Sequence, residues 1–173
     1  MTHQRVLSAL CAVLIVIVMA ARPAAAADST ASTDRTGHLA PGLGFGFLTS
    51  TEKNTILGFE LHGDYFVNNE VSVGPLLQLG TAADFTLVGL SAQVKYTFDL
   101  PSNPMVHPNA QLGVGFVHTD DHRNQTSVLV PFGGGVDVNF AKNAAMTATL
   151  LIDASGLHDD LFLSMFFGFK ILI

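Results

Sequence analysis

The stretch LFLSMFFGFKILI, residues 161–173, decides the fold. Counting back by twos from Ile173 gives only large apolar side chains, whereas the alternate positions include Lys170, Gly168 and Ser164. A period of two is typical of a β-strand, in which successive side chains point to opposite faces. A lysine opposite an unbroken apolar row is typical of a strand with lipid on its outer side and a polar lumen on its inner side. The segment therefore predicts the closing strand of a membrane barrel.

The same alternation recurs along the chain from His38 onward. It predicts eight strands: residues 39–48, 55–66, 71–80, 85–98, 107–119, 128–140, 144–153 and 161–173. An even number of strands, each about as long as the 9 to 11 residues that cross a bilayer at a tilt, favours a transmembrane barrel. A soluble β-sandwich also alternates. The inner face here is rich in glycine, however, and the outer face is almost purely Leu, Val, Ile and Phe, as a narrow barrel requires. The fold class expected is all-β, an eight-stranded antiparallel up-and-down transmembrane barrel.

The N-terminal region differs from the rest of the chain. Residues 1–26 have a short polar start, an apolar core and an alanine-rich end, which is typical of a cleaved secretory signal peptide. Residues 27–37 are polar without apolar periodicity, so we expect a disordered lead-in. The barrel is expected to occupy residues 38–173.

Composition excludes several functions. The 173 residues are 49% hydrophobic and carry a net charge of −6, so no basic patch is available for nucleic acid. The single cysteine, Cys11, lies inside the signal peptide, which excludes disulfides and thiol chemistry in the mature chain.

Connection lengths predict the orientation. The short connections 67–70, 99–106 and 141–143 are expected on the periplasmic side, and the connections 49–54, 81–84, 120–127 and 154–160 are expected on the outer side. Pro75 within the third strand predicts a local break in the hydrogen-bond ladder.

The inner face carries ionisable residues, which are expected to form a polar network that fills and stiffens the lumen: Glu60, His62, Asp64, Lys95, Asp137, Asp153 and Lys170. Charges buried away from water must be paired or wetted. A proton or ion path is the less favoured interpretation. At inner positions a small polar residue is expected to be tolerated, as in Gly168→Ser, whereas Phe167→Arg on the outer face is expected to destabilise the barrel.

A second polar cluster lies on the predicted outer rim: His118, Asp120, Asp121 and His122 in one connection, and His158, Asp159 and Asp160 in another. Imidazoles and carboxylates on adjacent loops are potential ligands of a divalent cation. Solvated polar loops are the favoured interpretation, so no metal or other cofactor is expected.

These residues resemble the small outer-membrane β-barrel family of Gram-negative bacteria, the eight-stranded barrels of the OmpA and OmpX types. The resemblance rests on the signal peptide, on DYFVNNEVSVGP (64–75), on GGGVDVNFAKNAAMTATL (133–150) and on the closing strand. It implies a location in the cell outer membrane and contact with its lipid and lipopolysaccharide. It also implies insertion by the outer-membrane assembly machinery, a monomer, and an envelope-integrity or surface-interaction role. Family members usually end in Phe or Trp, and Ile173 departs from that pattern.

The enzymatic alternative is a lipid A-modifying hydrolase. The chain is similar in size and barrel to the lipid A deacylases, which carry a His-x-Ser pair near the end of the seventh strand. The corresponding residues here are Asp153, Ala154 and Ser155, so the general base is missing. Ser155 with His158 is the remaining nucleophile and base pair, and no catalysis is expected.

Overall fold

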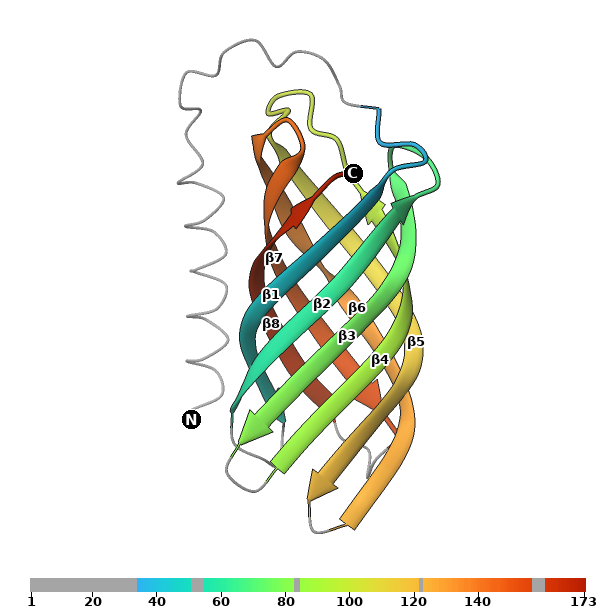
Figure 1. The fold of residues 1–173 in the computed structure, drawn as a ribbon, viewed down its shortest axis with the longest axis vertical. Helices are drawn as coiled ribbons and strands as arrows, with labels where there is room; N and C mark the ends of the chain where they lie inside the picture. The colour runs from blue at the N-terminus through green and yellow to red at the C-terminus, as the bar shows by residue number, and fades with distance from the viewer. Residues whose placement is uncertain (1–33, 51–54, 83–84, 122, 157–160) are drawn as a thin grey trace. The chain divides into compact units, whose positions relative to one another are not determined.

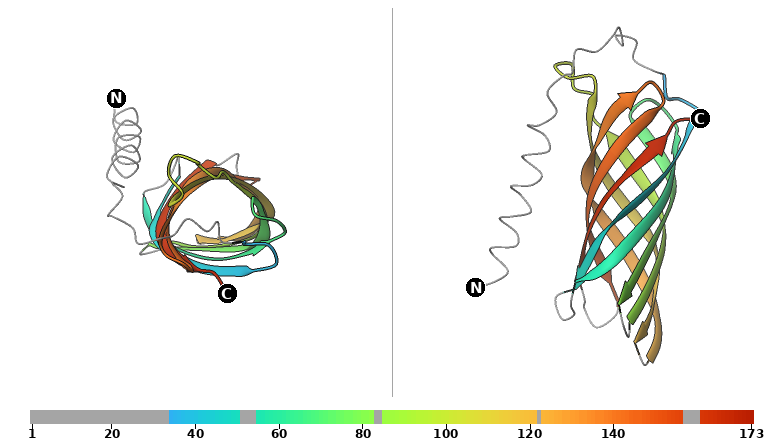
Figure 2. Two further views of the ribbon diagram at one scale, coloured as in Figure 1. Left: turned by 90° about the horizontal axis from the view of Figure 1, so that it is seen from above. Right: turned by 60° about the vertical axis from the view of Figure 1, so that its left-hand side comes forward.

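A computed structural model describes residues 34–50, 55–82, 85–121, 123–156 and 161–173. Eight antiparallel strands, each paired with its sequence neighbours, form one closed barrel (Figures 1 and 2). They are β1 (Leu39–Ser50), β2 (Ile56–Phe66), β3 (Val71–Ala82), β4 (Phe85–Thr97), β5 (Val106–Asp121), β6 (Arg123–Ala141), β7 (Ala144–Ser155) and β8 (Leu161–Ile171). All eight predicted strands are therefore confirmed. No helix among the described residues is long and apolar enough to cross a membrane.

Pairing of the last strand with the first closes the barrel. The β1–β8 register places Phe45 opposite Phe167. Beyond the strand, Leu39 and Ile173 exchange backbone hydrogen bonds of 3.1 and 2.8 Å. A closed barrel leaves its strands without free edges, and this allows a sheet to sit in lipid with its backbone groups paired.

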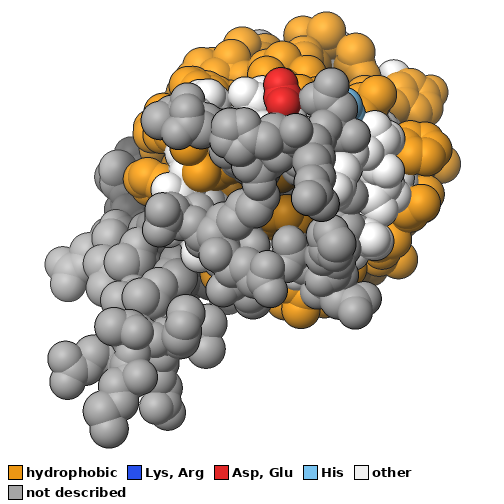
Figure 3. Space-filling model, turned by 90° about the horizontal axis from the view of Figure 1, so that it is seen from below, with side chains coloured by type: hydrophobic (Ala, Val, Ile, Leu, Met, Phe, Trp, Pro, Cys, Tyr) orange, Lys and Arg blue, Asp and Glu red, His pale blue; other side chains and the backbone are white. Residues whose placement is uncertain are grey.

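The outer face of the barrel is apolar along its length. Phe45, Leu112, Phe116 and Met146 are among the large apolar side chains that are more than half exposed. Viewed from below, hydrophobic side chains gather around the circumference of the barrel (Figure 3). Soluble monomers rarely expose so large a continuous apolar surface, so the surface fits a lipid environment.

The two ends of the barrel differ in their connections. We call the end with connections 67–70, 98–105 and 142–143 the turn end, and the opposite end the loop end. The prediction of a loop over 120–127 is wrong, because β5 and β6 continue and pair to Asp121 and Arg123. The hairpin reaches farther than the others (Figure 1). Most of its residues are polar, so the sequence shows no alternation of apolar and polar positions there. Backbone pairing does not depend on side-chain polarity, so the strands continue.

Pro75 interrupts the ladder as predicted. Pairing of β2 with β3 stops at His62 and Leu76 and resumes at Tyr65 and Val73. On its other side Pro75 remains opposite Ala92 of β4. Proline has no N–H to donate, so the ladder is lost on one side only.

The inner glycines contradict the expectation for Gly168→Ser. A Cβ atom at Gly168 would collide with the backbone carbonyl oxygen of Leu43 on β1. A Cβ atom at Gly46 would collide in the same way with the carbonyl of Met165 on β8. Backbone atoms of a paired strand cannot move aside, so glycine is required here for the close approach of two strands.

The start of the barrel unit lies earlier than predicted. Residues 34–37 were expected to be disordered, yet the Arg35 N–H donates to Asn69 Oδ1 at 2.7 Å. The Gly37 N–H donates to the Phe66 carbonyl at 2.8 Å, and Gly37 has a φ of 79°, which suits glycine. These partners lie at the end of β2 or in the turn after it, so the hydrogen bonds attach residues 34–37 to the barrel. Residues 1–26, predicted to be a signal peptide, and residues 27–33 lie outside the described residues.

Candidate functional site: the lumen

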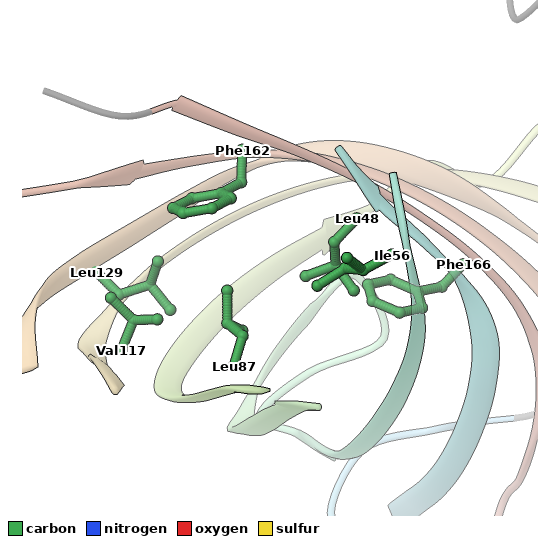
Figure 4. Close-up of a cluster of buried hydrophobic side chains, with 7 residues drawn as sticks. All are labelled: Leu48, Ile56, Leu87, Val117, Leu129, Phe162 and Phe166. Carbon is green, nitrogen blue, oxygen red and sulfur yellow. The ribbon is translucent and has the colours of Figure 1, made fainter. Parts of the chain in front are cut away.

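The loop-end half of the lumen holds a layer of apolar side chains. Six strands contribute inward-facing residues to this apolar layer: Leu48, Ile56, Leu87, Val117, Leu129, Phe162 and Phe166. All are at most 7% exposed, and in Figure 4 they project from the barrel wall into its interior. Sequence reasoning missed this layer because it expected polar residues on the inner face. The signal was present, since all seven residues occupy the inner phase of their strands.

Ion pairs occupy the turn-end half of the lumen. Lys95 Nζ donates to Asp64 Oδ2 at 2.8 Å. Lys170 Nζ donates to Asp137 Oδ2 at 2.7 Å and to Asp64 Oδ2 at 3.3 Å. All four side chains are buried. They come from β2, β4, β6 and β8, so the pairs join strands around the ring.

Glu60 and His62 form a separate pair on β2. His62 Nδ1 lies 3.0 Å from Glu60 Oε1, and among the described residues neither Glu60 Oε2 nor His62 Nε2 has a hydrogen-bond partner. Gly42 leaves the space for the ring, because a Cβ atom there would lie 2.6 Å from His62 Cε1. A cavity of about 10 Å³ adjoins the pair, enough for about one water molecule. Its polar lining includes Glu60, His62, Asp64, Gln93, Lys95 and Gln111.

Asp153 lies apart from the lysines. Ser164 donates to its Oδ2 atom, as does Gln78 Nε2 at 3.2 Å. Asp153 Oδ1 has no partner in the described part of the chain. Asp153 is 2% exposed. Its two hydrogen-bond donors, an amide and a hydroxyl, carry no charge.

A further cluster, centred on Asp99, caps the turn end of the lumen. The Arg35 guanidinium lies 5.4 Å from the ring centre of buried Phe66 and donates to Asp99 Oδ1 at 2.8 Å. His107 Nδ1 lies 2.9 Å from the same oxygen, and Asn139 Nδ2 lies 2.9 Å from His107 Nε2. The asparagine amide donates to Nε2, so Nδ1 carries the proton that is donated to Asp99. Sequence reasoning missed this cap because Arg35 lies in a segment without periodicity.

The rim residues are only partly described. His118 lies on the outer face of β5 with Nδ1 2.9 Å from Thr126 Oγ1, and Asp120 is exposed. The side chain of Asp121 lies outside the described residues, as do His122, His158, Asp159 and Asp160. Among the residues that are described, no group of three His, Cys, Asp or Glu is placed to hold a metal.

The candidate hydrolase pair cannot be assembled from the described residues. Ser155 ends β7 opposite Leu129. His158, its proposed base, lies outside the described residues. The geometry that the described side chains do provide is that of a filled lumen. All seven residues predicted for the polar network lie on the inner face. Four of them form the ion pairs and two form the Glu60–His62 pair, whereas Asp153 bonds to Gln78 and Ser164 instead.

Searches with protein-family models and against curated proteins find no match. Solved structures do match. The attachment invasion locus protein Ail of Yersinia pestis is 17% identical with a TM-score of 0.58, over 80% of this chain and 99% of that chain. Neisserial surface protein A is 13% identical with a TM-score of 0.64, over 78% and 95%. OprG of Pseudomonas aeruginosa is 12% identical with a TM-score of 0.61, over 82% and 98%. The chain therefore has the fold of the small eight-stranded outer-membrane β-barrels of Gram-negative bacteria.

Proposed function

We propose that the protein resides in the cell outer membrane as a non-conducting, non-catalytic barrel with an envelope-integrity or surface-interaction role. The observation that carries the proposal is the filled lumen. Its apolar layer, its ion pairs and its Arg35 cap follow one another from the loop end to the turn end. Proteins that work through a pore need an open path. A filled barrel works through its outer surface and its ends.

The apolar outer face supports direct contact with lipid and lipopolysaccharide as the surroundings of the barrel. We propose that the outer-membrane assembly machinery inserts the chain as a monomer. Pairing of β1 with β8 within one chain supports the monomer, because a closed sheet needs no second copy to satisfy its edges.

Conductance measurements in planar bilayers test the closed lumen. The full chain is expected to give no unit conductance steps, whereas a porin inserted into the same bilayers gives them. Phe166→Ala with Phe162→Ala removes two rings from the apolar layer and serves as the matched comparison. Steady steps from the parent protein would contradict the proposal.

A surface-interaction role is favoured by the extended β5–β6 hairpin. β6 pairs with β7 only from Leu129 onward, while its pairing with β5 reaches Arg123. Within the described residues, positions 123–127 therefore have ladder partners on one side only. A strand edge with unpaired backbone groups is able to accept another strand.

Shortening the β5–β6 hairpin distinguishes a surface-interaction role from an envelope-integrity role. Deleting residues 120–125 is expected to leave a folded barrel that still migrates fast on an unboiled detergent gel. If the hairpin serves surface interaction, cells with the shortened protein should aggregate and adhere less, while their resistance to detergent stays at the parental level. Loss of detergent resistance with unchanged adhesion would favour envelope integrity instead.

A further inference from the structure

The hydrogen-bond ladder between β1 and β8 is interrupted, like the ladder between β2 and β3. Strand pairing of β1 with β8 ends at Gly42. Beyond it, Leu39 exchanges backbone hydrogen bonds with Ile173. Pro41 lies in the interval, and proline has no N–H to donate to a neighbouring strand. The β1–β8 ladder therefore has a break at Pro41, as the β2–β3 ladder has one at Pro75.

The two breaks lie at one height of the wall, on either side of the β1–β2 pair. Pro41 is opposite Gly63 in the β1–β2 ladder, which is continuous. The register of β2 with β3 places Pro75 opposite the same Gly63. We call the β1–β2 pair the wall panel. Both joints of the panel, to β8 and to β3, are weakened at this height by a proline.

Asp64 ties the wall panel to the barrel on both sides. It follows Gly63 on β2, and its side chain is buried in the lumen. Lys95 Nζ, from β4, donates to Asp64 Oδ2 at 2.8 Å and so reaches over β3. Lys170 Nζ, from β8, donates to the same oxygen at 3.3 Å and so reaches over β1. Each lysine spans one of the two breaks, and charge-assisted hydrogen bonds are stronger than the backbone bonds that the prolines lack.

The second buried ion pair spans a part of the wall that has no break. Lys170 also donates to Asp137 of β6 and so reaches over β7. At this height β7 is paired on both sides, because Thr147 lies opposite Asp137 in one ladder and opposite Gly168 in the other. This pair therefore serves as a comparison for the two arms of Asp64.

A third break of the wall has no such arm. Pairing of β5 with β6 stops at Leu112 and resumes at Gly115, and Pro131 lies in the interval on β6. Within the described part of the chain, no ion pair reaches across this break. The β5–β6 break is therefore an internal reference for the other two.

We propose that Asp64 with Lys95 and Lys170 is a clamp that holds the wall panel in place, and that loss of the clamp opens the barrel sideways at the two proline breaks. The opening is lateral because the apolar layer and the cap of the turn end do not include the clamp residues. The polar cavity lies behind the β2–β3 break, since Gly74 and Pro75 line it together with Asp64 and Lys95. Opening of this edge connects the cavity with the lipid side.

Hydrogen–deuterium exchange of the full chain in phosphatidylcholine vesicles, read by mass spectrometry, tests the clamp. Lys95→Met leaves Asp64 with Lys170 alone and should raise amide exchange beside the β2–β3 break about tenfold or more. Exchange beside the β1–β8 break should rise much less, because Lys170 still spans it. Asp64→Asn weakens both arms and should raise exchange beside both breaks.

Pro75→Val distinguishes the clamp from a general effect on stability. The Gly63 carbonyl oxygen faces β3 at the break, since a Cβ atom at Gly74 would collide with it. Pro75→Val supplies an N–H donor beside this acceptor and should return the exchange of Lys95→Met close to the parental level. Asp137→Asn is the matched control, because it removes a buried pair that spans continuous ladders. Its exchange beside both breaks should stay within about twofold of the parent.

Two results would overturn the proposal. Exchange in Lys95→Met that rises beside the β5–β6 break at Pro131 as much as beside the β2–β3 break would show a general loss of stability. An effect of Lys95→Met that Pro75→Val leaves unchanged would show that the ion pair does not compensate for the broken ladder. If Lys95→Met does not fold, recovery of folding by Pro75→Val supports the clamp, and failure to recover rejects it.

Discussion

The two halves of the lumen are closed by different forces. In the loop-end half, rings and aliphatic side chains such as Phe166 and Leu48 exclude water without needing specific partners. In the turn-end half, the side chains of Lys95 and Lys170 fill the lumen. Their buried charges are tolerated there only because Asp64 and Asp137 lie within hydrogen-bond distance. The comparison shows that one inner face, built by one alternating pattern, is apolar at one end and charged at the other. Loss of one residue should therefore have different consequences in the two halves.

The largest effect is expected from Lys170→Met in the charged half. Removal of the ammonium leaves Asp137 buried without its cation, which should cost about 3 to 5 kcal/mol of unfolding free energy. The urea midpoint of the barrel in vesicles measures the loss. Lys142→Met in the exposed turn is the control and should change little.

A second substitution sharpens this prediction. Asp137→Asn in the Lys170→Met background removes the unpaired charge and should recover much of the lost stability. If the double variant is no more stable than Lys170→Met, the charge pair is not what holds the turn-end half together.

Phe166→Ala in the apolar half should cost about 3 to 4 kcal/mol. The ring is 1% exposed, and its loss leaves a cavity in the apolar layer. The same urea titration measures the effect. Phe166→Leu, which keeps most of the apolar volume, should cost less than half as much. Rescue of Phe166→Ala by a distant charge substitution such as Asp137→Asn would contradict the separation of the two halves.

On the outer face, lipid surrounds both halves of the barrel, so a substitution there is expected to act through its contact with lipid alone. Phe167→Arg places a charge near the middle of β8 on the lipid side and should cost about 2 to 3 kcal/mol. The fraction of protein that migrates fast on an unboiled gel is the readout. Thr147→Ser is the inner-face control, because Gly168→Ser would force a collision with Leu43. Full folding of Phe167→Arg would reverse the assignment of inside and outside.

The smallest effect is expected at the cap. The side chain of Asp99 is half exposed, so water and salt screen its pair with Arg35. Arg35→Ala should therefore cost up to about 1 kcal/mol, measured by the urea midpoint at low salt, and the difference should shrink at high salt. A loss as large as that of Lys170→Met would show that the cap, rather than the buried pairs, closes the turn end.

Much of the fold could be predicted because alternation along a strand is a local property. The inner and outer phases of residues 161–171, and the break at Pro75, are set by neighbouring residues and by the missing proline N–H. The length of the β5–β6 hairpin could not be predicted in this way, since its polar residues give no apolar row. The order of residues 34–37 also escaped prediction, because their partners lie on β2 and in the turn after it.

The sequence by itself determined which residues point into the lumen, since side-chain direction follows from position along a strand. Only the tertiary structure decided which of them meet. Lys170 reaches Asp64 because barrel closure pairs β8 with β1, which pairs with β2 in turn, whereas Asp153 on β7 bonds to Gln78 and Ser164 instead of a lysine. Strand stagger and barrel closure set these distances, and both arise from backbone pairing between segments far apart in the chain.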